Sequence, residues 1–363
     1  MRITDVKPRI VDLGQGFLWG GRREMEVKAV FLTLHTDEAI DGYACCWSAQ
    51  LPAESVVAAV EAAAKPLLIG ADPLTRPQIL AALQSGARVG TPLAAIGVVD
   101  VALWDLAGKA AGVPIAQLLG GYRQRVKACA SAPPCETVDT CEPMLMEIVE
   151  QGFRAIKLHV SGDLQTDIET CRVARRAVGG EVDLMMDAMG IYDRRKALAL
   201  GRVLDELEFR WYEDPLPDTD AAGWVALCRD LTTPVAGVDS VRFSASDYAR
   251  AVADGAYDVV RMDGARHGIS QLKQLASVAE AFGITCEGHS FGPALAQAAN
   301  LQVGLAVRNS DYCELPVPLG ALDAGVVQGL RLDREGYVVA PEGPGLGLEL
   351  EPEALDAITV ASP

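Results

Sequence analysis

The chain has 363 residues, and this length favours two domains because single cores stop growing near about 250–300 residues. Half of the residues are hydrophobic, enough to form buried cores. Its formal net charge of −17 argues against a nucleic-acid partner, since phosphate is bound by clustered lysine and arginine. It contains no apolar run of roughly 18 residues, as a membrane span requires, and its nine scattered cysteines fit reduced thiols in a cytoplasmic protein.

The first 35 residues contain two runs in which apolar and polar residues alternate, and this pattern predicts a β-hairpin or meander. A Gly-rich segment that also holds bulky aromatic residues, Gly14–Arg23, separates the two runs, and we expect a loop there. Residues 53–85 and 92–110 have alanine and leucine at helical spacing and are predicted to be helical.

From about residue 126 the chain alternates short apolar runs with Ala/Leu-rich stretches, which predicts successive βα units. Seven helical stretches separate eight predicted strands. The strands are residues 126–131, 154–160, 182–187, 209–213, 234–239, 257–263, 284–289 and 311–314. Beyond residue 326 we predict short strands and turns that return to the N-terminal part.

Six polar residues close or nearly close six of these runs, at steps of 24 to 26 residues. They are Asp187, Glu213, Asp239, Asp263, His289 and Glu314. Parallel strands joined by right-handed crossovers place all their C-terminal ends on one face. That face carries the chemistry in (β/α)8 barrels, so the six residues predict a site.

The first three acids, Asp187, Glu213 and Asp239, end three successive strands and are expected to converge on one hard cation. Mg²⁺ prefers such oxygen ligands, which makes it the expected cofactor. Asp263 beside His289 predicts an acid–base pair, because a carboxylate fixes the imidazole tautomer and raises its basicity.

Lys157 and His159 are two residues apart on the second predicted strand, so both side chains face the same side. Lys157 would neutralise a substrate carboxylate, and His159 would move a proton. Glu314, when protonated, would hydrogen-bond a developing enediolate oxygen. Alternatively it is a structural acid paired with Lys157.

Four stretches resemble the enolase superfamily, within it the mandelate racemase-like branch (the mandelate racemase/muconate lactonizing enzyme family). They are ALWDLAGKAAGVPIAQLLGG, WYEDPLP, YDVVRMDGARHGIS and PEGPGLGLEL. The resemblance implies an α/β fold, a (β/α)7β modified TIM barrel at residues 126–325 with an N-terminal α+β capping domain at 1–125. Residues 326–363 would return to this cap.

The resemblance also implies Mg²⁺ ligands at Asp187, Glu213 and Asp239, with a catalytic His289–Asp263 dyad and an eighth-strand Glu314. Two positions depart from the family pattern. His159 stands where the Lys-x-Lys motif has its second lysine, and Met189 stands where a polar residue is frequent.

The resemblance implies removal of a proton α to a carboxylate, in a family where a Lys or His base works with Mg²⁺. We expect an acid-sugar dehydratase in which His289 is the preferred base; alternatively His159 takes the proton and His289 gives one up. A racemase or epimerase, a sugar-lactone cycloisomerase and a non-catalytic metal- and ligand-binding barrel remain alternatives.

The expected substrate is a small carboxylate-bearing molecule, selected by loops of the capping domain. Trp19 or Trp47 would close over it, and Arg22 or Arg23 would clamp a distal carboxylate. A homo-oligomer is expected from the family.

Overall fold

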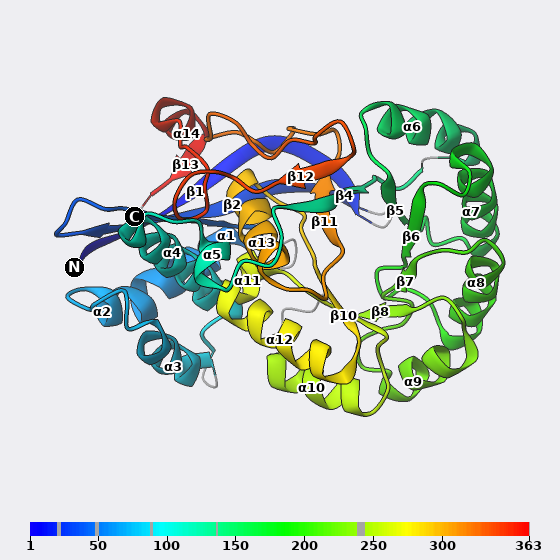
Figure 1. The fold of residues 1–363 in the computed structure, drawn as a ribbon, viewed down its shortest axis with the longest axis horizontal. Coiled ribbons are helices and arrows are strands. Elements are labelled where there is room, and N and C mark those ends of the chain that lie inside the picture. The colour runs from blue at the N-terminus through cyan, green and yellow to red at the C-terminus, as the bar shows by residue number, and fades with distance from the viewer. Residues whose placement is uncertain (20–22, 48–50, 88–89, 136, 238–243, 363) are drawn as a thin grey trace.

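A closed eight-stranded parallel barrel and a separate four-stranded antiparallel sheet make up the protein, whose structure is a computed structural model (Figure 1). The structure describes residues 1–19, 23–47, 51–87, 90–135, 137–237 and 244–362, with the backbone alone over the described part of 15–27. The sheet and its helices form a cap beside the barrel, as predicted.

The cap sheet has the strand order β13-β1-β2-β3. Its main strands are β1 (Ile3–Trp19), β2 (Arg23–Thr36) and β3 (Gly42–Cys46). The predicted loop at Gly14–Arg23 was wrong in extent, because the β1–β2 ladder continues to the pair Trp19↔Arg23. Gly14 has a φ of 63° and lies where the strand register shifts between Asp12 and Gly16. Glycine adopts this positive φ without strain, so it permits the irregularity within the hairpin.

Helices of the cap pack on one another and on this sheet. They are α1 (Ala53–Ala59), η1 (Val60–Ala64), α2 (Lys65–Leu68), α3 (Arg76–Ala87), α4 (Leu93–Ala111) and α5 (Ile115–Leu118). Helix α4 is buried along most of its length because it is apolar on nearly every side. It ends at Gly112, whose φ of 68° terminates the helix in the left-handed conformation.

The barrel confirms the eight predicted strands. They are β4 (Arg125–Ser131), β5 (Ala155–His159), β6 (Asp183–Asp187), β7 (Trp211–Glu213), β8 (Val235–Gly237), β9 (Val259–Met262), β10 (Thr285–Gly288) and β11 (Tyr312–Pro316). Neighbours in this order pair in parallel, and pairing of β11 with β4 closes the barrel. Apolar side chains, including those of Met185 and Trp211, fill its interior.

Helices surround the barrel and form an arc from α6 to α10 on the side away from the cap (Figure 1). They are α6 (Val138–Glu150), α7 (Leu164–Val178), α8 (Arg194–Glu206), α9 (Ala221–Asp230), α10 (Ala245–Ala253), α11 (Gly264–His267), α12 (Ile269–Phe282) and α13 (Ala294–Ala306). Asp163, Asp193 and Asp220 cap helices α7, α8 and α9 through their side chains.

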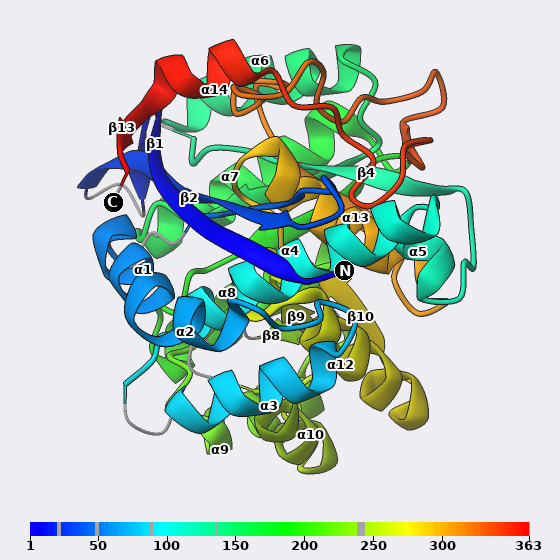
Figure 2. The same ribbon diagram turned by 90° about the vertical axis from the view of Figure 1, so that its left-hand side faces the viewer.

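The C-terminal segment runs back from the barrel to the cap (Figure 2). Strand β12 (Tyr337–Val339) pairs with β4, and β13 (Thr359–Ala361) pairs with β1. The short strands were predicted, but helix α14 (Pro352–Ile358) was not. It starts with proline at its first position, where the missing N–H is tolerated.

Two further expectations concern the whole chain. All nine cysteines lie in the described part and are free thiols, as predicted, and seven of them are buried. Over the described ranges, no helix has both the length and the hydropathy needed to cross a bilayer.

Candidate active site

The C-terminal ends of the barrel strands bring most of the predicted site residues to one face. Asp187 and Glu213 end the adjacent strands β6 and β7 and pair in register. Asp263 and His289 follow β9 and β10 directly, while Glu314 lies within β11. The even spacing in sequence therefore corresponds to a shared edge of the barrel, because each βα unit advances the chain by one strand.

Lys157 of β5 lies at the centre of three carboxylates. Its ammonium is 3.2 Å from Asp187 Oδ2, 3.2 Å from Glu213 Oε1 and 3.0 Å from Glu314 Oε1. The side chain is only 1% exposed. Burial alone would lower the pKa of Lys157, but Glu213, Glu314 and Asp187 raise it above its usual range. Lys157 is therefore a fixed positive charge inside the site.

Arg261 of β9 is a second buried cation, which the sequence reasoning missed. Its Nε lies 3.2 Å from Glu213 Oε1, and its Nη2 donates to Glu314 Oε2. Burial would raise the pKa of Glu314, but Lys157 and Arg261 hold it well below its ordinary value. Of the two roles considered for Glu314, the contact with Lys157 and the lowered pKa favour the acid that pairs with Lys157. The signal was present, because Arg261 lies on the predicted strand 257–263, two residues before Asp263.

Asp187 and Glu213 are the candidate Mg²⁺ ligands that the structure describes. Met189 N donates to Asp187 Oδ1 at 2.8 Å, and Trp211 Nε1 donates to Glu213 Oε2 at 3.1 Å. Burial would raise the pKa of Asp187, but Lys157 and His159 lower it below its usual range, so the carboxylate is ionised.

The third candidate ligand, Asp239, lies outside the described residues. Within the described ranges, no group of three His, Cys, Asp or Glu side chains is arranged to hold a metal ion. The chemistry of the two described acids nevertheless fits Mg²⁺, because oxygens from adjacent strands already converge on one cation, the Lys157 ammonium.

His159 ends β5 and has a defined orientation. Its Nδ1 lies 2.7 Å from the carbonyl oxygen of Ala132, and a carbonyl only accepts, so Nδ1 carries a proton. Its Nε2 lies 3.5 Å from Asp187 Oδ2. In the neutral ring, Nε2 is therefore the nitrogen of His159 that carries the lone pair.

The predicted pair of Asp263 and His289 is brought together, but Arg266 lies between them. His289 Nδ1 is 3.6 Å from Asp263 Oδ2 and 2.8 Å from Arg266 Nη2. Arg266 Nε also donates to Asp263 Oδ2 at 2.8 Å. Burial would raise the pKa of Asp263, but Arg266 and His289 hold it below its ordinary value.

Local chain geometry explains this insertion. Asp263 caps the short helix α11 by accepting from Ala265 N at 2.8 Å, and one helical turn returns Arg266 to the capping residue. Asn300 Nδ2 donates to the same Asp263 oxygen at 3.0 Å. The sequence reasoning missed Arg266 and Asn300, although the spacing of three from Asp263 to Arg266 was a readable signal.

Of the candidate substrate-binding residues, the structure describes the side chain of Trp47. It is buried, and its ring centroid lies 5.4 Å from that of Phe291, two residues beyond His289. Trp47 thus joins the cap to the barrel beside the site. The backbone of Trp19 ends β1, while its side chain and the whole of Arg22 lie outside the described residues.

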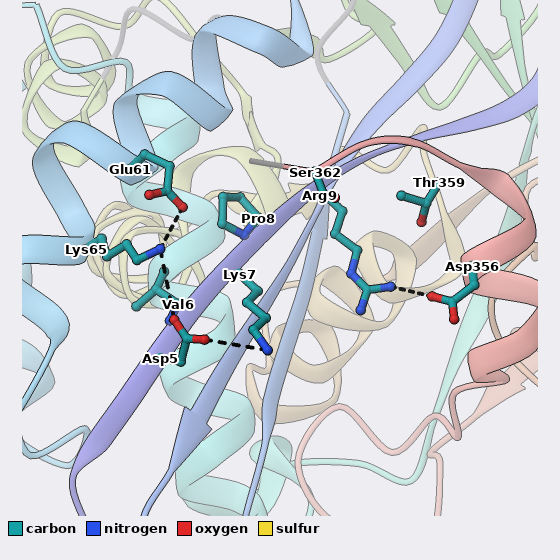
Figure 3. A pocket seen from close by; sticks show the side chains of 10 residues that line it. All are labelled: Asp5, Val6, Lys7, Pro8, Arg9, Glu61, Lys65, Asp356, Thr359 and Ser362. Atoms are coloured by element: carbon teal, nitrogen blue, oxygen red, sulfur yellow. Dashed lines mark hydrogen bonds and ion pairs between the residues drawn. The ribbon is translucent and has the colours of Figure 1, made fainter.

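A groove of about 590 Å³ lies elsewhere, on the cap (Figure 3). Its lining residues come from β1, η1, α2, α14, β13 and the residue that follows β13. The charged groups there pair with each other, as in Arg9–Asp356 at 2.7 Å and Lys65–Glu61 at 3.1 Å. The groove is thus separate from the strand-end face, and the charged side chains that line it already neutralise one another.

Two protein-family models match the chain over most of its length. Residues 22–120 match the N-terminal domain of mandelate racemases and muconate lactonizing enzymes, and residues 142–354 match the enolase C-terminal domain-like family. These ranges fall on the cap and on the barrel with its C-terminal return.

Individual relatives agree with these models. An arabinonate dehydratase of Saccharolobus solfataricus is 30% identical over 81% of both chains. A D-galactarolactone cycloisomerase of Agrobacterium fabrum is 27% identical over the full length of both. The crystal structure of D-glucarate dehydratase from Agrobacterium tumefaciens, complexed with magnesium, is 29% identical with a TM-score of 0.87, covering 99% of this chain and 100% of the other.

Proposed function

Since this chain belongs to the mandelate racemase and muconate lactonizing enzyme family of the enolase superfamily, we propose that it is an acid-sugar dehydratase. It removes the proton α to a carboxylate and eliminates the β-hydroxyl. One observation carries the proposal: Lys157, three carboxylates and His159 are in contact on the strand-end face, which also carries His289. Two of the similar proteins are an arabinonate dehydratase and a D-glucarate dehydratase, and this likeness supports the proposal.

Asp187, Glu213 and Asp239 would hold Mg²⁺, which supplies positive charge to the substrate carboxylate when bound. Lys157 adds a second charge at the same place. Because it is buried and already oriented by Glu314, it meets negative charge without reorganisation as the α-proton leaves. One preorganised group of this kind lowers the activation free energy by about 3 kcal/mol.

The two histidines approach the substrate from different parts of the barrel. His159 ends β5 and His289 follows β10, and β4 and β11 lie between these strands. As the α C–H bond breaks, its proton passes to a histidine and its electron pair moves into the carboxylate, which gives an enediolate. The pair then returns to form the Cα=Cβ bond as the β C–O bond breaks, and the hydroxyl leaves as water with a proton from the protein. The resulting enol tautomerises to a 2-keto acid when its hydroxyl proton is lost to solvent and the β-carbon takes one up.

Lactone cycloisomerisation is the second candidate, because a cycloisomerase is similar over the full chain. Racemisation or epimerisation would use His159 and His289 on opposite faces of the α-carbon. Both share the first proton transfer with dehydration, so the products must separate them. A barrel that binds metal and acid without turnover is the non-enzymatic alternative.

The test is incubation with Mg²⁺ and a library of aldonic and aldaric acids and their lactones in D₂O. Dehydration gives a 2-keto acid that reacts with semicarbazide. Racemisation gives deuterium at the α-carbon without keto acid, and cycloisomerisation gives a rearranged lactone by NMR. Absence of keto acid from every substrate would refute the proposal. The Arg172→Met variant, which is altered on the exposed face of α7, serves as a control and should give the same products as the wild-type protein.

A further inference from the structure

The His289 imidazole is in hydrogen-bond contact with an arginine. Arg266 Nη2 lies 2.8 Å from His289 Nδ1, while the Asp263 carboxylate is 3.6 Å from that nitrogen, too far for a hydrogen bond. The expected direct carboxylate–imidazole bond is therefore replaced by a guanidinium that contacts both partners.

The position of Arg266 is fixed from several sides. Its Nε donates to Asp263 Oδ2 at 2.8 Å, and Asp263 is itself held by Ala265 N and Asn300 through its other oxygen. The Arg266 side chain is only 9% exposed. A buried guanidinium that contacts both Asp263 and His289 has little rotational freedom. Its Nη2 therefore presents a hydrogen-bond donor to His289 in one direction.

An arginine only donates hydrogen bonds, because its guanidinium remains protonated and has no acceptor. Its contact with His289 Nδ1 therefore requires a lone pair on that nitrogen, and the proton of the neutral ring must sit on Nε2. We infer that Arg266 is a positioning residue that holds His289 as the Nε2-protonated tautomer, a hydrogen-bond donor to the substrate rather than the base.

The catalytic consequence rests on the proposed function. A neutral ring with its proton on Nε2 does not accept the α-proton there, so His159 takes it. The same Nε2 of His159 then returns the proton to the departing β-hydroxyl, which leaves as water, and the histidine is restored. His289 meanwhile hydrogen-bonds a substrate oxygen. This assignment reverses the sequence-based preference for His289 as the base.

The tautomer is measured directly in the full-length protein without substrate. The chain has four histidines, so ¹⁵N-histidine labelling gives a spectrum simple enough to assign with a His289→Asn variant. At a pH where the ring is neutral, Nδ1 of His289 is expected to show the shift of an unprotonated nitrogen and Nε2 that of a protonated one. A proton on Nδ1 in the wild-type protein would overturn the inference.

Two variants test the cause. Arg266→Met removes the donor, so the proton is expected to move to Nδ1, facing Asp263. Arg266→Lys keeps one donor and is expected to retain the wild-type tautomer. Arg172→Met, with its exposed pair to Glu169, controls for loss of positive charge and leaves the spectrum unchanged. An unchanged tautomer in a folded Arg266→Met protein would contradict the inference.

This experiment separates the two proposals. The wild-type spectrum alone decides the tautomer, even when a variant does not fold. Failure to turn over any acid sugar would refute dehydration and leave the tautomer assignment intact. Conversely, a keto-acid product together with a proton on Nδ1 would support dehydration and reject the positioning role of Arg266.

Discussion

Gly97 of cap helix α4 lies directly against the backbone carbonyl of Arg266. A β-carbon at position 97 would stand 2.1 Å from that oxygen, a distance that no packed structure tolerates. The missing side chain lets α4 support the turn that follows β9, where Asp263 and Arg266 lie. The cap therefore contributes to the geometry of the site through this backbone contact as well as through the packing of Trp47 on Phe291.

Gly97→Ala is expected to destabilise the protein and to lower turnover. Glycine to alanine in a helix is ordinarily stabilising, but here the new methyl group must displace backbone, which costs about 1–3 kcal/mol. Urea unfolding and kcat are the measurements. Gly180→Ala is the control, because a β-carbon there meets no atom within 4 Å. Equal stability of the two variants would contradict the packing argument.

Asp100 lies one turn further along α4, and its buried carboxyl group leads us to expect a pH dependence of stability. It accepts hydrogen bonds from Ser270 N at 2.8 Å and from Ser270 Oγ at 2.7 Å, with Arg76 as the nearby charge. Burial raises its pKa from 3.8 to about 6 in spite of these partners. The folded protein therefore holds this proton at pH values where the unfolded chain has released it.

The contribution of Asp100 to stability is consequently full below pH 3.8 and is lost as pH rises through about 6. A shift of roughly two units corresponds to about 3 kcal/mol. The side chain of Asp100→Asn has no proton to lose. Between pH 3.8 and about 6, the free energy of unfolding of this variant is therefore expected to rise by about 3 kcal/mol relative to that of the wild-type protein. Urea unfolding at several pH values tests this, and a difference between the two proteins that does not change with pH would exclude it.

Lys157→Met is expected to cost about 3–5 kcal/mol of folding free energy, because it leaves three buried carboxylates without their shared ammonium. Turnover should also be lost. Lys7→Met is the control, since Lys7 is 52% exposed and its pair with Asp5 is screened by water. Comparable urea midpoints for both variants would show that Lys157 is not the charge that balances the site.

Mg²⁺ is expected to stabilise the folded protein by about 2.7 kcal/mol at a hundred times its Kd, and excess EDTA should reverse this. Glu213→Gln is expected to weaken binding, because the amide carries no charge for the cation. Asp139→Asn, in the exposed first turn of α6, should leave binding unchanged. Titration calorimetry and thermal unfolding measure both effects, and an unaltered Kd in Glu213→Gln would remove that residue from the ligand set.

Exchange of the α-proton in D₂O distinguishes the two histidines. His159→Asn is expected to slow exchange by about 100-fold or more, the usual contribution of a general base. His289→Asn is expected to retain exchange while slowing elimination, because it loses only a hydrogen-bond donor. Proton NMR of the substrate reports both steps. The opposite pattern, with exchange lost in His289→Asn alone, would restore His289 as the base.

The sequence by itself determined the barrel and the residues at its strand ends. Apolar runs about 25 residues apart specify βα units, and the handedness of the crossovers leaves one face for residues such as Asp187 and Glu213. These are local rules with a fixed period, so they can be read without coordinates. The same logic placed Lys157 and His159 on one side of their strand.

Only the tertiary structure decided how these groups pair. The spacing of three brings Arg266 to Asp263, but no local pattern says that Arg266 also reaches His289. Nor does any local pattern say that Arg261 joins Glu213 to Glu314. Such contacts depend on side chains from strands up to 53 residues apart in sequence. Their energies follow from burial and distance, which are properties of the packed fold and not of any segment.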